Sequence, residues 1–164
     1  MIWRALNSAD CERIFIIGNQ IHADYQEDRA VFESRFALYP EGCLVLEGNG
    51  ALKGYAISHP WKLFDPPKLN TVLDTLPARP DTYYLHDLAL LPEARGGGHA
   101  GQGIDLLARH AASQGYDNST LVAVGGTKPF WERQGYGVQN HQALSSHLAS
   151  YDKDAAYMLR SLDK

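Results

Sequence analysis

The spacing of apolar residues changes along the chain between a helical period and a strand-like period. Ile14 and Ile17 recur at helical spacing, which predicts a first helix over residues 8–22. A second helix is predicted over residues 27–39, because aromatic residues share one of its faces, and Pro40 ends it. The first quarter of the chain is therefore expected to form a pair of helices.

Shorter apolar runs bounded by turn residues predict strands. They lie at residues 2–6, 43–47, 51–58, 83–91, 120–124, 136–138 and 157–162. Asn49-Gly50 is a strong hairpin signal between two of these runs. Further helices are expected near residues 71–76, after the glycine-rich turn at residues 95–101, and over residues 129–134.

The order of these elements mixes a hairpin with strand–helix–strand crossovers. That order predicts an α/β domain with a mixed sheet and helices on both of its faces. With 164 residues and no internal repeat, the chain is expected to form one domain over residues 1–164. A long proline-rich connection at residues 60–82 interrupts the pattern, and long connections of this kind are often functional.

Composition narrows the function classes. The formal net charge is -4 and no cluster of Lys or Arg is present, so no nucleic-acid partner is expected. No apolar run is long enough to span a bilayer, so no membrane partner is expected. Residues 1–7 do not resemble a signal peptide, and a cytoplasmic location is the expectation. The two cysteines and seven histidines lack metal-ligand spacing, so no metal site is expected.

The segment from Leu88 to Leu107 carries the strongest signal, because a strand enters a turn of small residues and a helix leaves it. Such a turn directs backbone N–H groups and the positive end of a helix at one spot, which suits a pyrophosphate. A P-loop needs a Lys followed by Ser or Thr, and none follows this turn. Residues 96–101 do match the GxGxxG string of dinucleotide-binding folds, but no acidic residue ends the next strand.

A third string fits better: Arg or Gln, two residues, Gly, one residue, then Gly or Ala. Arg95, Gly98 and Ala100 meet it. With the strand before the turn and the later block Pro129-Phe130-Trp131-Glu132-Arg133-Gln134-Gly135-Tyr136, residues 83–138 resemble the core of the GNAT superfamily of N-acetyltransferases. The arrangement is similar to the arylalkylamine branch, which includes serotonin N-acetyltransferase.

The resemblance implies a mostly antiparallel sheet of about six to seven strands, with the central strand splayed from its neighbour by a bulge. Acetyl-CoA would be the co-substrate, its pantetheine arm in the splay and its pyrophosphate in the turn. The residues implied to bind it are Leu88, Ala89, Leu90, Arg95, Gly96, Gly97, Gly98, His99, Ala100, Gly101 and Phe130.

Catalysis requires a base for the amine and a donor for the departing thiolate. By strand alternation Tyr84, His86 and Leu88 share one face, and Asp87 points the other way. His86 aligns with a histidine of the arylalkylamine relatives, which makes it the expected base. The family's usual acid is a tyrosine where this chain has Trp131, so Tyr136, Tyr84 or water would have to replace it.

These observations predict an acetyl-CoA-dependent N-acetyltransferase that acts on a small-molecule amine by direct transfer in a ternary complex. A non-catalytic domain that binds or senses acyl-CoA is the alternative, and a nucleotide-dependent oxidoreductase is a weaker one. The residues do not identify the acceptor amine. They leave the oligomeric state open, with a homodimer as one alternative because relatives often pair.

Overall fold

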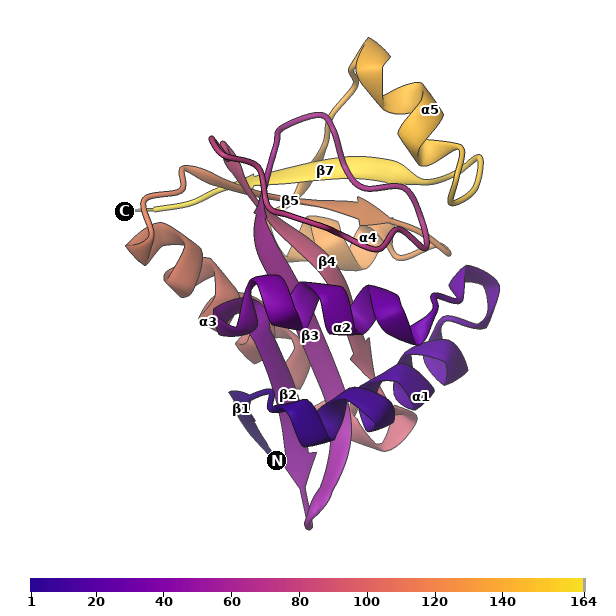
Figure 1. Ribbon diagram of the computed structural model, residues 1–164, viewed down its shortest axis with the longest axis vertical. Coiled ribbons are helices and arrows are strands. Elements are labelled where there is room, and N and C mark those ends of the chain that lie inside the picture. Colours follow the sequence, from indigo (N-terminus) through magenta and orange to yellow (C-terminus); the bar gives the residue numbers. More distant parts are fainter. Residues whose placement is uncertain (164) are drawn as a thin grey trace.

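The computed structural model describes residues 1–163, whose centre is one seven-stranded sheet (Figure 1). Its strands are β1 (Ile2–Ala5), β2 (Cys43–Gly48), β3 (Ala51–Trp61), β4 (Thr82–Leu90), β5 (Asn118–Ala123), β6 (Gly137–Val138) and β7 (Ala156–Ser161). They lie in the order β1-β2-β3-β4-β5-β7-β6, and every neighbouring pair is antiparallel except β4 and β5. The predicted mixed, mostly antiparallel sheet is confirmed.

Helices cover both faces of this sheet (Figure 1). They are α1 (Cys11–Ile21), α2 (Arg29–Leu38), α3 (His99–Ser113), α4 (Lys128–Arg133) and the short α5 (Ser145–Leu148). The pair α1 and α2 lies on one face, and α3 and α4 lie on the other. The first predicted helix begins as a short 3-10 turn at Ser8, where Asn7 and Asp10 form a capping box.

Each face of the sheet has its own core. Ile14, Ile17 and Phe32 of the first two helices pack against β2 and β3. On the opposite face, Ile104 and Leu107 of α3 pack with a second cluster from β4, β5 and β7. Within residues 1–163, no helix is long and apolar enough to cross a membrane.

The segment between β3 and β4 contains no helix, so the predicted helix at residues 71–76 was wrong. At Thr71 and Leu73 its backbone groups bond to side chains of α2. Arg35 Nη1 donates to the Thr71 carbonyl at 2.8 Å, and the Leu73 N–H donates to Ser34 Oγ at 3.2 Å. Tertiary contacts to α2 therefore hold this segment in an irregular path.

Candidate active site

A bulge in β4 decides which side chains face the site. Ile57 pairs with Asp87 and Ser58 pairs with Leu85, so His86 is an extra residue in β4. A bulge of this kind breaks the alternation of side chains along the strand. His86 and Asp87 therefore both reach residues on the α1 and α2 side of the sheet.

The same bulge corrects two expectations about β4. Asp87 does not point away from His86, because its carboxylate meets His22 at the end of α1. Leu88 does not share the face of His86, because it packs with Leu85 in the cluster around α3. Simple alternation failed at the one position where the strand carries an extra residue.

Next to the bulge, β4 and β5 part. Their parallel pairing covers only Tyr83 with Ser119 and Tyr84 with Thr120. Beyond these pairs a cleft of about 490 Å³ opens between the strands and the segment that follows α1. Residues along its walls include His22, His86, Asp87, Leu88, Phe130 and Trp131.

His86 forms a buried hydrogen-bonded pair with Glu27 in the wall of this cleft. His86 Nε2 lies 2.8 Å from Glu27 Oε1, and the two side chains are 3% and 7% exposed. The other carboxylate oxygen of Glu27 accepts a hydrogen bond from the Asn70 N–H at 3.0 Å. Burial opposes ionisation of Glu27, but its attraction to His86 outweighs burial and lowers its pKa. Glu27 thus orients His86 through a charged hydrogen bond.

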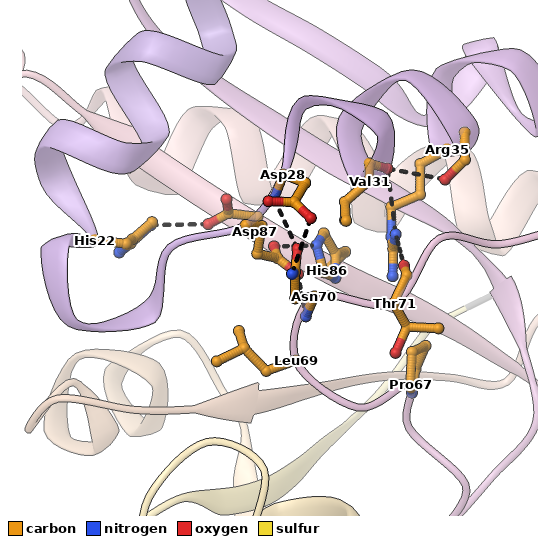
Figure 2. A network of polar contacts seen from close by, with 12 residues as sticks. His22, Asp28, Val31, Arg35, Pro67, Leu69, Asn70, Thr71, His86 and Asp87 are labelled. Carbon is orange, nitrogen blue, oxygen red and sulfur yellow. Dashed lines mark hydrogen bonds and ion pairs between the residues drawn. The ribbon is translucent and has the colours of Figure 1, made fainter.

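A second histidine–carboxylate pair lies beside the first (Figure 2). His22 Nε2 is 2.8 Å from Asp87 Oδ1, and the Tyr55 hydroxyl donates a hydrogen bond to Asp87 Oδ2. Burial would raise the pKa of Asp87, yet the charge of His22 and these contacts lower it. In return the charge of Asp87 raises the pKa of His22, against the effect of burial.

Neither Glu27 nor His22 was identified from the sequence as a site residue. Both lie near the connection between the first two helices, with no motif around them. Their partners come from β4, about sixty residues later in the chain. Only the packing of α1 and α2 on the sheet brings the four side chains together.

The glycine-rich turn leads from β4 into α3 and has the backbone that an anion site requires. Gly96 and Gly98 have φ angles of 82° and 80°, and a side chain at either would project into open space. Gly98 caps α3, so the first N–H groups of the helix have no partner within it. Arg95 Nε donates to the Leu90 carbonyl at 3.1 Å, which ties the turn to the end of β4.

Two further contacts hold the start of α3. Trp3 Nε1 donates to the His99 carbonyl at 2.8 Å, so β1 supports the first helical turn. The ring of His99 lies 3.3 Å from Gln102 Oε1, within the helix itself. The His99 side chain thus engages its own helix.

The tyrosines considered as acids lie outside the lining of the cleft. The Tyr136 hydroxyl is 2.9 Å from Ser119 Oγ in the core beneath β5. Tyr84 is buried behind His86, with its ring centroid 6.3 Å from that of His86. Trp131 does line the cleft and packs edge-on against Phe130. Placement therefore gives neither Tyr136 nor Tyr84 a position in the wall of the cleft.

Contacts between distant segments form one end of the cleft. The Tyr25 hydroxyl donates a hydrogen bond to Asp152, which follows the last helix. Tyr151 donates to the Pro67 carbonyl at 3.1 Å, and both Tyr25 and Tyr151 line the cleft. Among residues 1–163, no group of three or more His, Cys, Asp or Glu side chains is arranged to hold a metal ion.

Comparison with known proteins gives a family and several structural neighbours. The sequence model of the acetyltransferase (GNAT) family matches residues 5–144. No curated protein matches the chain in sequence. The chain is similar in structure to N-acetylglutamate synthase from Neisseria gonorrhoeae, complexed with coenzyme A and N-acetyl-glutamate, with a TM-score of 0.76 and 16% identity. The match covers 99% of this chain and 35% of that protein, so the chain spans about a third of its length.

Two other neighbours match over nearly their whole length. One is the GNAT-like decarboxylase GphF in complex with isobutyryl-CoA, with a TM-score of 0.79, 14% identity, and coverage of 99% of this chain and 100% of that one. The other is an aminoglycoside 6'-N-acetyltransferase complexed with coenzyme A, with a TM-score of 0.72, 12% identity, and coverage of 100% and 98%. At these identities the likeness establishes the fold.

Proposed function

Because the chain belongs to the acetyltransferase (GNAT) family and is an acyltransferase, we propose that it transfers the acetyl group of acetyl-CoA to the amine of a small molecule. The transfer is direct, within a ternary complex. The observation that carries this proposal is the buried pair of His86 and Glu27 in the wall of the cleft where β4 and β5 part.

The splay and the turn fit the two ends of the acetyl-CoA arm. Past the pair Tyr84 and Thr120, the edge of β4 that faces β5 is free to pair with the amide groups of pantetheine, as an added strand does. Leu88, Ala89 and Leu90 supply that edge. The pyrophosphate then meets the backbone N–H groups of residues 95–101 at the start of α3, and Phe130 packs beside the arm.

His86 is the base in this proposal. Its Nε2–H donates to Glu27, which fixes the tautomer and leaves Nδ1 to accept a proton. Nδ1 of His86 is buried and has no hydrogen-bond partner within residues 1–163. It takes the proton of the attacking amine, directly or through one water, as the amine forms its bond to the acetyl carbon.

The acceptor enters from the end of the cleft bounded by Tyr25, Leu69 and Tyr151. A volume of about 490 Å³ lies within the range of small-molecule sites and must also hold the thioester end of acetyl-CoA. A small amine therefore fits this space better than a folded macromolecule.

A panel of small amines tests the proposal, with release of CoA thiol from acetyl-CoA as the signal. Transfer predicts thiol release that depends on one or more amines. Loss of carbon dioxide from an acyl-CoA leaves the thioester intact, so the same signal separates transfer from decarboxylation. If none of the amines in the panel causes release of CoA thiol, the proposed reaction is contradicted.

The second candidate function is an acyl-CoA-binding domain without turnover. Trp131 favours it, since the indole stands where the family usually has its tyrosine acid and cannot readily give up a proton. Saturable binding of acetyl-CoA with no thiol release across the amine panel is the result that this candidate predicts.

A further inference from the structure

Transfer requires a proton for the departing sulfur, and the tyrosines expected from the sequence do not line the cleft. Tyr25 and Tyr151 do line it, but their hydroxyls donate to Asp152 and to the Pro67 carbonyl. Tyr136 is bonded to Ser119 in the core, and Tyr84 lies behind His86. Trp131 reaches the cleft, but its indole N–H does not readily release a proton. Another group in the cleft must act, or solvent must.

His22 is a titratable side chain in this cleft that lies outside the His86–Glu27 pair. It follows the last residue of α1, and its side chain is 28% exposed. Its Nε2 lies 2.8 Å from the carboxylate of Asp87, and Figure 2 shows the two side chains pointing toward each other from α1 and β4. The Tyr55 hydroxyl holds the far oxygen of Asp87, so the carboxylate is fixed on both sides.

We infer that His22, held in place by Asp87, is the acid that protonates the departing CoA sulfur. The inference rests on the proposed transfer reaction. In it Asp87 is a positioning residue, because it acts through His22 and does not touch the substrate.

The position of His22 along the proposed acetyl-CoA arm supports this role. The arm runs back along β4 from the turn at residues 95–101 toward the bulge at His86. At roughly 3.3 Å per strand residue, the four residues from Leu90 back to His86 span about 13 Å. The sulfur end then lies beside residues 86–88, and His22 contacts this segment through both Asp87 and the backbone of Leu88.

The two histidines would divide the proton transfers. The amine nitrogen bonds to the acetyl carbon as His86 takes the amine proton. The carbon–sulfur bond then breaks, its electron pair stays on sulfur, and sulfur takes the proton of His22. His22 regains a proton from solvent and His86 returns one, so the enzyme ends as it began and no oxidant or reductant is needed.

Local charges favour a protonated His22. The groups facing it are the carboxylates of Asp87 and Glu27 and the backbone of Leu88, and together they raise its pKa against the cost of burial. His59 shows the opposite case in the same protein. It is buried without a carboxylate partner and near the cation Arg35, and its pKa falls to about 3.

The test compares pH profiles of kcat, with acetyl-CoA and the amine saturating, for the wild type, His22→Gln and Asp87→Asn. The kcat of the wild type should fall at alkaline pH, because His22 loses its proton there. His22→Gln should lower kcat by about 10²–10⁴-fold and abolish this alkaline decline. Asp87→Asn should move the decline to lower pH, because a neutral amide no longer favours the charged imidazole.

His110→Gln is the matched control, since it removes a half-buried imidazole that pairs with Tyr39 at 2.7 Å, away from the cleft. It should keep the wild-type profile. Retained stabilisation by acetyl-CoA shows that each variant is folded.

An unchanged alkaline decline in His22→Gln overturns the role of His22 while leaving the transfer reaction standing. Absence of turnover in the wild type with every amine overturns both. If the alkaline decline of kcat disappears in His22→Gln but occurs at the wild-type pH in Asp87→Asn, the role assigned to Asp87 is overturned.

Discussion

His86 and Asp87 are consecutive residues of β4, yet their side chains both meet partners from the layer of α1 and α2. The bulge between Ile57 and Ser58 on the neighbouring strand makes this possible. As a result His86 meets Glu27 and Asp87 meets His22, and two histidine–carboxylate pairs stand side by side in one cleft.

The glycine-rich turn can be tested with two glycines of similar backbone. Gly98 has a φ of 80° at the start of α3, and Gly50 has a φ of 74° in the β2–β3 hairpin. Valine at either position should cost at least about 1–2 kcal/mol of stability through the positive φ. Thermal unfolding should show that acetyl-CoA still stabilises Gly50→Val but no longer stabilises Gly98→Val. Equal stabilisation of both variants would contradict the pyrophosphate site.

His86→Gln tests the base. The glutamine is polar but does not titrate, so kcat should fall by about 10²–10⁴-fold while the Kd for acetyl-CoA stays nearly constant. The remaining pH dependence should follow the amine alone. Steady-state kinetics and a binding titration measure the two quantities. Near-equal kcat values for wild type and variant across the pH range would assign His86 a structural role.

Two glycines of α3 should respond to alanine in opposite directions. A Cβ at Gly103 would lie 2.7 Å from the Trp3 ring, whereas one at Gly101 would lie 3.7 Å from Gln134 Oε1. Gly103→Ala should therefore lose about 1–3 kcal/mol through overpacking. Gly101→Ala should gain up to about 1 kcal/mol from helix propensity. Denaturant unfolding without ligand measures both, and a stabilised Gly103→Ala would argue against the packing of Trp3 on α3.

His59 should make the protein sensitive to acid. Burial, aided by the charge of Arg35, lowers its pKa to about 3, below the usual value of 6.5. The unfolded state therefore binds a proton more readily than the folded state. The contribution of His59 to the free energy of unfolding is therefore complete above pH 6.5. It is lost as pH falls toward 3, by up to about 1.4 kcal/mol per pH unit. The aromatic variant His59→Phe should flatten this slope in denaturant unfolding at several pH values, and parallel curves for both proteins would refute the assignment.

The elements that the sequence predicted well are those with strong local signals. The capping residues before α1, the proline after α2 and the Asn-Gly hairpin all act within a few residues of where they stand. The glycine-rich turn is equally local, since Gly98 must adopt a positive φ to begin α3.

The parts that could not be predicted depend on distant partners. The bulge is set by the register between β3 and β4, and no residue near His86 marks it. Glu27 and His22 become site residues only because α1 and α2 pack beside β4. The segment around Thr71 is irregular because Arg35 and Ser34 on α2 bind its backbone.

Mass spectrometry of the products made from acetyl-CoA with a labelled acetyl group tests the central claim most directly. The account predicts that an acceptor from the amine panel gains one labelled acetyl group on nitrogen, with one CoA thiol released for each. Label found only on hydroxyl groups, or only in free acetate, would contradict it.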